Sequence, residues 1–307
     1  MIFIFLDGVG IGKKSEHNPF YVSNTEYLPF FEQDNVLHDG TPIKPIDARM
    51  GVDGIPQSAT GQTTIYTGTN IPKLLNSHIG SFPNKHMRAL IKKSNIFKQL
   101  REKGLSTMFL NTYPRHSNLF YKTNVDIDGN FIFSKDFPSK YKKKISVTSC
   151  LLITNKIKPF DISDLLDKNS IYQDYSNKSL IKLGIKCLEY SPETAAEIMY
   201  NSSKKYDFLL YEYFQTDIYG HRKTIDECNI LVKNLNRLIK KLISLLEKKQ
   251  DTLLITSDHG NLEELSNKKH TLNPVPLITW GYKDKYLRDK INNLADITPA
   301  ICDYFKK

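Results

Sequence analysis

The sequence predicts an α/β protein with a doubly wound, mostly parallel sheet and a small inserted cap. Short, largely apolar runs such as Ile2–Leu6 and Phe208–Tyr213 are typical of strands buried on both faces. Segments of helical period alternate with these runs, and this alternation favours a layered sheet covered by helices. At 307 residues the chain is long enough to form one large core with an insertion.

The first third of the chain follows this alternating pattern. The strand at Ile2–Leu6 ends in the turn Asp7-Gly-Val-Gly. A helix over residues 59–67 is predicted to open at Ser58 and to stop at Gly68. A second helix over residues 95–103 ends at Gly104, and a strand over residues 105–110 follows it.

Residues 112–169 differ from the rest because they are rich in Lys, Asn, Ser and Asp. An Asp-Gly turn at 128–129 separates two short strand-like runs at 124–127 and 131–133, which is typical of a hairpin. We therefore expect an α/β core formed by residues 1–111 and 170–307, with residues 112–169 as an inserted α+β cap.

In the last third of the chain, predicted helices and strands alternate again. The predicted elements are a helix from Pro192 to about Ser203, a strand at Phe208–Tyr213, an amphipathic helix over residues 225–249, strands at Thr252–Thr256 and over residues 276–280, and a closing helix over residues 294–305.

Composition restricts the class of protein. The net charge of +10 comes mainly from scattered lysines, which favours a solvated surface. A basic mouth for an anionic small substrate is the second interpretation, and nucleic-acid binding, for which no motif is found, is the third. Four widely separated cysteines and a short apolar start without basic residues are typical of a cytoplasmic protein. No run is long enough to cross a membrane.

Potential metal ligands follow the predicted strands. Because the carboxyl ends of parallel strands meet at one edge of a sheet, three acids placed there would repel one another unless cations lay between them. Carboxylates and imidazoles together suit Mn²⁺ or Zn²⁺, with Mg²⁺ as a third choice. The candidate ligands, enough for two ions, are Asp7, Asp217, His221, Asp258, His259 and His270.

Ser58 is the candidate nucleophile, because backbone amides at the predicted helix start favour an anion. A base or a metal ion must activate its hydroxyl. Thr60, Thr63 and Thr64 are competing hydroxyls in the same run. Asp217 and His221 are four residues apart and can reach one ion if their segment is helical.

Five motifs in order resemble the alkaline phosphatase superfamily: Asp7-Gly-Val-Gly, Gln57-Ser-Ala-Thr-Gly61, Asp217-x-x-Gly-His221, Ser257-Asp-His-Gly-Asn261 and His270-Thr-x-Asn-Pro-Val-Pro276. They are most similar to the metal-binding domain of cofactor-independent phosphoglycerate mutase and less similar to phosphopentomutase. The resemblance implies an alkaline phosphatase-like fold. It also implies one ion at Asp217, His221 and His270. A second ion would lie at Asp7, Asp258 and His259, beside Ser58 as the residue that becomes phosphorylated.

Two departures concern the substrate. Gln62 stands where those mutases usually have a histidine. The large phosphotransfer domain that carries the phosphoglycerate-binding arginines in that family has no counterpart, because only about 60 to 100 residues between the nucleophile run and Tyr206 could form an inserted cap. Arg115 is the one phosphate contact that we suggest in its place.

We expect a phosphomutase or phosphomonoesterase that acts on a small phosphorylated metabolite through a phosphoserine. A phosphodiesterase, a phosphonate or sulfate-ester hydrolase, and a non-catalytic protein that binds metals and anions are the alternatives. The sequence does not distinguish the mutase from the phosphatase, and it does not predict the oligomeric state.

Overall fold

The computed structural model describes residues 1–32 and 36–306. Among these residues a six-stranded central sheet has the strand order β2-β8-β7-β1-β6-β3. Its strands are Ile2–Leu6 (β1), Ile43–Ile46 (β2), Thr107–Phe109 (β3), Phe208–Tyr213 (β6), Thr252–Thr256 (β7) and Val275–Gly281 (β8). β7, β1, β6 and β3 run parallel, whereas β8 is antiparallel to β7 and β2 is antiparallel to β8. The mostly parallel α/β sheet is therefore confirmed.

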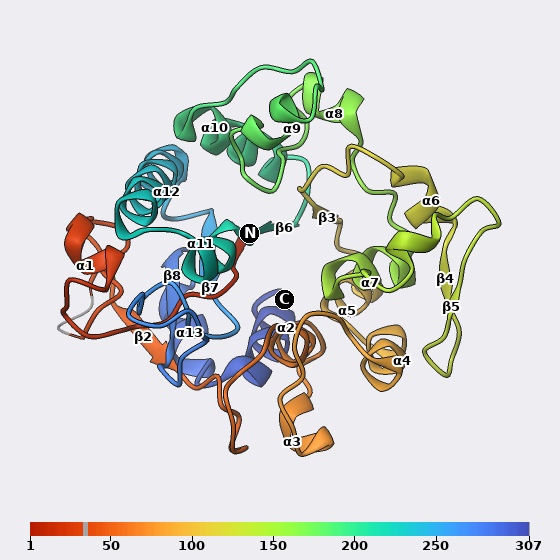
Figure 1. Ribbon diagram of the computed structural model, residues 1–307, viewed down its shortest axis with the longest axis horizontal. Coiled ribbons are helices and arrows are strands. Elements are labelled where there is room, and N and C mark those ends of the chain that lie inside the picture. The colour runs from red at the N-terminus through yellow and green to blue at the C-terminus, as the bar shows by residue number, and fades with distance from the viewer. Residues whose placement is uncertain (33–35, 307) are drawn as a thin grey trace.

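Helices surround this sheet in Figure 1. The α-helices are Pro19–Ser23 (α1), Ser58–Thr67 (α2), Ile71–Leu75 (α3), Lys85–Lys93 (α4), Ile96–Glu102 (α5), Ser117–Lys122 (α6), Val147–Asn155 (α7), Ile162–Leu166 (α8), Lys178–Lys182 (α9), Pro192–Ser203 (α10), Gln215–Arg222 (α11), Ile225–Leu245 (α12), Asp284–Lys290 (α13) and Ile297–Tyr304 (α14). Two 3₁₀ turns cover Ser139–Tyr141 and Leu294–Asp296.

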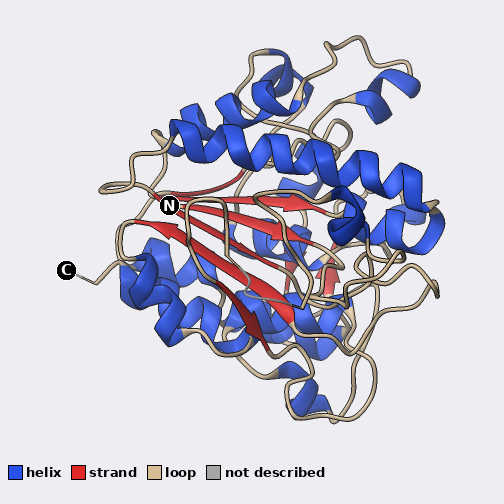
Figure 2. Cartoon of the chain, turned by 90° about the vertical axis from the view of Figure 1, so that its left-hand side faces the viewer, coloured by secondary structure: helices blue, strands red, loops and turns tan. Residues whose placement is uncertain are grey.

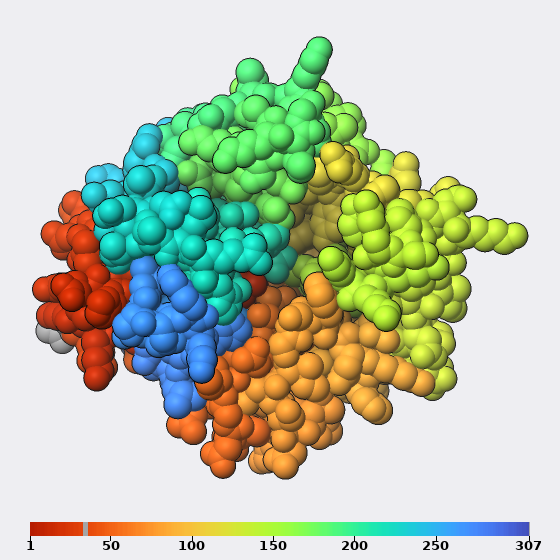
Figure 3. Space-filling model, in the orientation of Figure 1, coloured from red at the N-terminus to blue at the C-terminus, as the bar shows by residue number. Residues whose placement is uncertain are grey.

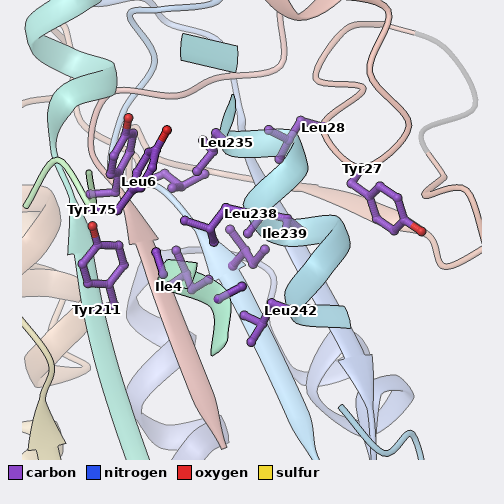
Figure 4. Close-up of a cluster of buried hydrophobic side chains, with 14 of the residues drawn as sticks. Ile4, Leu6, Tyr27, Leu28, Tyr175, Tyr211, Leu235, Leu238, Ile239 and Leu242 are labelled. Carbon is purple, nitrogen blue, oxygen red and sulfur yellow. The ribbon is translucent and has the colours of Figure 1, made fainter. Parts of the chain in front are cut away.

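The sheet lies between two helical layers (Figure 2). Alternate side chains of β1 point to opposite faces, as the two-residue period of a strand requires. Ile4 and Leu6 pack with α12, and Figure 4 shows both near Leu238 of that helix. Phe3 and Phe5 belong to the core of the other face, together with side chains of α2, α5, α7 and α14. Burial on both faces explains why β1 is apolar throughout.

The helix and strand limits agree closely with the sequence. α10 begins at Pro192 after its cap Ser191, and α2 ends at the left-handed Gly68, both as expected. Two details differ. The cap of α2 is Gln57, so Ser58 is the first helical residue, and α12 ends at Leu245 rather than near residue 249.

Residues 112–169 contain the expected hairpin, formed by Asn124–Val125 (β4) and Phe131–Ile132 (β5). The hairpin lies at the periphery, on the right of Figure 1. By contrast, α7 from the same segment packs against α2, α4 and α5 and contributes to the core of the sheet. The segment therefore joins the main body through α7.

None of the helices in the described part of the chain is long and apolar enough to cross a membrane.

Candidate metal centre

The loops that follow β1, β6 and β7 converge at the carboxyl edge of the sheet. Asp7 follows β1. Its backbone carbonyl accepts a hydrogen bond of 2.5 Å from Oγ1 of Thr216, which lies in the first turn of α11. Gly8 has a φ of +69°, and a Cβ at this position would lie 2.6 Å from Asp217 Oδ1. Glycine is thus required for β1 and α11 to approach so closely.

The first cluster contains Asp7, Asp258, His259 and Ser58. His259 Nε2 lies 3.3 Å from Asp7 Oδ1, 3.6 Å from Asp258 Oδ2 and 3.0 Å from Ser58 Oγ. Metal–ligand bonds of about 2.0–2.2 Å place neighbouring ligand atoms roughly 3–3.5 Å apart. These four side chains therefore have the spacing of ligands around one small cation.

The second cluster contains Asp217, His221 and His270. Asp217 Oδ1 lies 3.4 Å from the Nε2 atoms of both histidines, which are 3.1 Å from each other. Asp217 and His221 lie one turn apart on α11, so the condition that their segment be helical is met. Two ring nitrogens that approach so closely need either a proton or a cation between them.

The two clusters are adjacent. The rings of His259 and His270 stack with centroids 3.8 Å apart. His259 also lies within reach of Asp217 and His270, but its short distances to Ser58 and Asp7 place it in the first cluster. We call these seven side chains, Asp7, Ser58, Asp217, His221, Asp258, His259 and His270, the acidic floor.

Backbone carbonyls fix the ring orientation of the three histidines. Nδ1 of His221 lies 2.7 Å from the Lys268 carbonyl, Nδ1 of His270 lies 3.0 Å from the Pro56 carbonyl, and Nδ1 of His259 lies 3.3 Å from the Gly260 carbonyl. Because a carbonyl only accepts, each Nδ1 carries a hydrogen, so in the neutral form of each ring Nε2 has the lone pair that a metal ligand needs.

Burial and the neighbouring charges shift the pKa values of side chains in the acidic floor. Burial and the neighbouring charge of Asp258 raise the pKa of Asp7 to about 7, and burial raises the pKa of Asp258. Burial lowers the pKa of His259, but the charges of Asp258 and Asp7 outweigh this effect and raise it to about 10. A divalent cation would satisfy the same negative field.

The donor set fits divalent metal ions. Asp7 Oδ1 is buried and accepts no hydrogen bond from the described residues. Such an oxygen is costly unless a positive charge satisfies it. Carboxylate oxygens and neutral imidazole nitrogens are the ligands that Zn²⁺ and Mn²⁺ accept.

Among the candidate hydroxyls of α2, that of Ser58 contacts another residue of the acidic floor, His259. The Thr60, Thr63 and Thr64 hydroxyls donate instead to backbone carbonyls 3.1, 2.6 and 2.7 Å away. All three threonines are buried. The local geometry thus favours Ser58 over the competing hydroxyls.

The floor opens into a cavity of about 1020 Å³. Figure 3 shows the front surface hollowed where the orange, teal, green and yellow-green segments meet. The side of the cavity formed by residues 112–169 includes Arg115, His116 and Lys144. The acidic floor contributes Asp7, Ser58 and Asp217 to the lining of the same cavity. Arg115 and the ligand clusters therefore share one space.

Three further residues were not assigned from sequence. Gln62 Nε2 lies 3.5 Å from Asp7 Oδ2 and 3.3 Å from Asp258 Oδ2, so a neutral amide donates to both carboxylates. Glu212 lines the cavity and accepts a hydrogen bond of 2.7 Å from Thr148. Burial raises the pKa of Glu212 to about 8. Its position inside an apolar strand concealed it in the sequence.

Glu263 is the third and connects the loops of the floor. Its carboxylate accepts hydrogen bonds from the Gly10 and Asn261 amides at 2.8 Å, and from Thr271 and Asn273. It thereby ties the loop after β1 to the loop after β7 and to the loop before β8. The position of Glu263 two residues after a predicted ligand run was the one signal available in the sequence.

Comparison with known proteins agrees with this architecture. A family model described as the metalloenzyme superfamily matches residues 1–307. The 2,3-bisphosphoglycerate-independent phosphoglycerate mutase of Ehrlichia canis is 32% identical over 124 residues, and that of Mycoplasmopsis synoviae is 31% identical over 144 residues. These matches cover 38% and 43% of this chain but 25% and 28% of the relatives, so the chain matches only about a quarter of their length.

Among solved structures, the alkaline phosphatase of the Antarctic bacterium TAB5 superposes with a TM-score of 0.51. The comparison covers 100% of this chain and 98% of the other at 12% sequence identity, and a mutant of the TAB5 enzyme gives a TM-score of 0.52. The fold is thus that of alkaline phosphatase. With a family match over its whole length, the chain belongs to the metalloenzyme superfamily.

Proposed function

We propose that the protein is a metal-dependent phosphoryl-transfer enzyme that acts on phosphate monoesters, with Ser58 as the nucleophile. One observation carries this proposal: Ser58 Oγ, at the start of α2, lies 3.0 Å from His259 Nε2 beside two buried carboxylates. The Ser58 side chain lines the cavity, so its hydroxyl is accessible to a substrate. The name of the partial relatives, phosphoglycerate mutase, supports the same reaction class.

The floor would hold two divalent ions. Asp217, His221 and His270 form one site, and Asp7, Asp258 and His259 form the other, with Ser58 beside it. Mn²⁺ or Zn²⁺ suits this donor set best, and Mg²⁺ less well. When bound, the ions would lower the pKa of the serine hydroxyl and offset the charge of the phosphate oxygens.

The chain's own groups orient the reaction. The positive end of the α2 dipole faces an anion at Ser58. As the bond from Oγ to phosphorus forms, the Ser58 hydroxyl gives up its proton and the ester bond breaks. The leaving alkoxide takes up a proton in turn, which gives a phosphoserine and a free alcohol. Water or a hydroxyl of the bound product then accepts the phosphoryl group. The first outcome defines a phosphatase and the second a mutase.

We assign residues 112–169 to a cap over this site. Support comes from the cavity, which residues 112–116 and 144–149 line opposite the floor. A cap that excluded water would favour transfer to a bound hydroxyl over hydrolysis. Arg115 would contribute a phosphate or carboxylate contact from this side.

The test is a screen of the purified protein with Mn²⁺, Zn²⁺ or Mg²⁺ against phosphorylated sugars, glycerates and nucleotides. The panel also contains a phosphodiester, a phosphonate and a sulfate ester. We expect turnover of monoesters, with about two ions per chain by elemental analysis. Ser58→Ala should abolish turnover and the phosphoprotein signal while both ions remain. Turnover that survives in this variant would overturn the assignment of the nucleophile, and a folded protein that binds no metal would overturn the proposal itself.

Hydrolysis and mutation are separated by the fate of the phosphate. A phosphatase releases inorganic phosphate that contains ¹⁸O from labelled water. A mutase returns the phosphoryl group to another hydroxyl without incorporating this label.

A further inference from the structure

Exposed apolar side chains gather at the mouth of the cavity. Ile55, Phe82 and Leu183 are 39%, 40% and 58% exposed, and all three line the cavity although they come from separate segments. We call them the apolar rim. Scattered exposed apolar residues are ordinary, but a group of them around one opening is typical of a binding surface.

Aromatic rings continue this surface inward. Phe109, Tyr113, Phe120, Tyr141 and Tyr172 line the cavity, and we call them the aromatic wall. Phe109 and Phe120 meet the ring of Tyr113 edge-on, with centroid distances of 6.3 and 5.1 Å. The Tyr113 hydroxyl is held 2.8 Å from Ser149 Oγ. The rings are therefore positioned in advance and need little rearrangement to contact a ligand.

The size of the cavity exceeds what a three-carbon phosphate ester requires. Sites for drug-sized ligands have volumes of about 300–1,000 Å³, and this cavity of about 1020 Å³ lies at the upper end of that range. A small sugar or glycerate bound at the acidic floor would leave the aromatic wall in contact with water. Glu212 also lines the cavity, and burial raises its pKa to about 8, so it adds little negative charge.

We propose that the substrate is a phosphate monoester whose alcohol part carries an aromatic ring system. The phosphate lies on the acidic floor while the ring packs between the aromatic wall and the apolar rim. This inference rests on the proposed function for the reaction, but it concerns the recognition of the part that is not transferred. Nucleotides and simple aryl-alkyl phosphates share the required chemistry.

The test compares esters with matched leaving alcohols on the metal-loaded protein. Benzyl phosphate is paired with cyclohexylmethyl phosphate, and adenosine 5′-monophosphate with ribose 5-phosphate. Because stacking of a ring contributes about 1–3 kcal/mol, kcat/KM should rise about five- to 150-fold with the aromatic member of a pair. A gain in both pairs indicates a nucleotide substrate, and a gain with benzyl phosphate alone indicates a simpler aryl-alkyl ester. Equal rates within both pairs would overturn the proposal.

A matched pair of variants locates the effect. Leu183→Ala should raise KM for benzyl phosphate about three- to tenfold and leave KM for glycerol phosphate unchanged. Leu188, 70% exposed and outside the cavity, serves as the control, and Leu188→Ala should change neither value. An equal change of KM for benzyl phosphate in the two variants would overturn the role proposed for the apolar rim.

Binding to the Ser58→Ala protein separates this inference from the proposed function. Calorimetry with benzylphosphonate and methylphosphonate needs no turnover. Tighter binding of benzylphosphonate would support the aromatic subsite even if no ester were hydrolysed. Equal affinities would overturn it even if the phosphoryl-transfer reaction were found.

Discussion

The acidic floor and the aromatic wall form two sides of one cavity but are built differently. Asp258 and His259 on the floor are fully buried, and each floor histidine is held by a backbone carbonyl. Apart from Phe109, which is buried, the wall and the rim are half-buried or exposed, and they belong mainly to residues 109–185. Under the proposed function, the chemistry would depend on loops that follow the central strands, whereas substrate choice would depend mainly on side chains from residues 109–185.

The largest effect should follow a change in the floor. Asp258→Asn or Asp217→Asn removes a charged ligand, so each should lose one of the two ions and about 10³-fold in kcat/KM. Metal content by elemental analysis should show which ion is lost. Asp128→Asn, in the exposed hairpin turn, is the matched control and should keep both ions. Retention of both ions in both floor variants would contradict the proposed ligand assignment.

Removal of the charge that connects the floor loops should have the next largest effect. Glu263→Gln keeps the shape of the side chain but weakens its hydrogen bonds to the Gly10 and Asn261 amides. We expect metal affinity to fall about 10- to 100-fold, as measured by competition with a chelating dye. Glu264→Gln, in which the parent side chain accepts one backbone bond from Ser266, should leave affinity unchanged. If the two variants lose affinity equally, Glu263 has no special role.

Glu212 lies between the two regions and should act on stability. Its folded pKa of about 8 exceeds the ordinary value of 4.5, so the folded state binds the proton more tightly than the unfolded state. The stabilisation is complete below about pH 4.5 and is lost as pH rises to about 8, by a few kcal/mol at roughly 1.4 kcal/mol per pKa unit. Urea unfolding in EDTA should show this decline, and Glu212→Gln should flatten it. An equally steep decline in the variant would assign it to other groups.

The smallest effect is expected at the cap. Arg115 is exposed, so its attraction for a phosphorylated substrate is screened by salt. Arg115→Ala should raise KM about threefold at low ionic strength and have less effect at high salt, with kcat unchanged. Arg237→Ala, which breaks an exposed pair with Glu193 outside the cavity, should not alter KM. A fall in kcat would instead place Arg115 in contact with the reacting phosphate.

Much of the floor could be predicted from the sequence because its ligands directly follow buried strands. Periodicity located β1, β6 and β7, and the carboxyl edge of a parallel sheet then brought Asp7, Asp217 and Asp258 together. The α/β fold and its resemblance to alkaline phosphatase are confirmed for the same reason. The division of the ligands between two ions and the limits of the cap stay predictions.

The wall could not be predicted, because its members share no period or motif. Tyr113, Tyr141 and Tyr172 come together through turns and short helices, whose paths depend on tertiary packing. Glu212 was hidden because it replaces an apolar residue in β6. Gln62 was noted only as a departure from the mutases, because a neutral amide gives no sign of the two carboxylates that it contacts. Such residues become visible only when distant segments are placed side by side.

The central position of β1 also has a consequence for biosynthesis. Ile2 pairs with Leu209 and with Leu253, so the first strand made finds its neighbours only after most of the chain has left the ribosome. The floor needs residues from 7 to 270, so it cannot assemble earlier. Loading of the proposed ions would therefore follow the docking of β7, and the apolar β1 strand is exposed to aggregation until then.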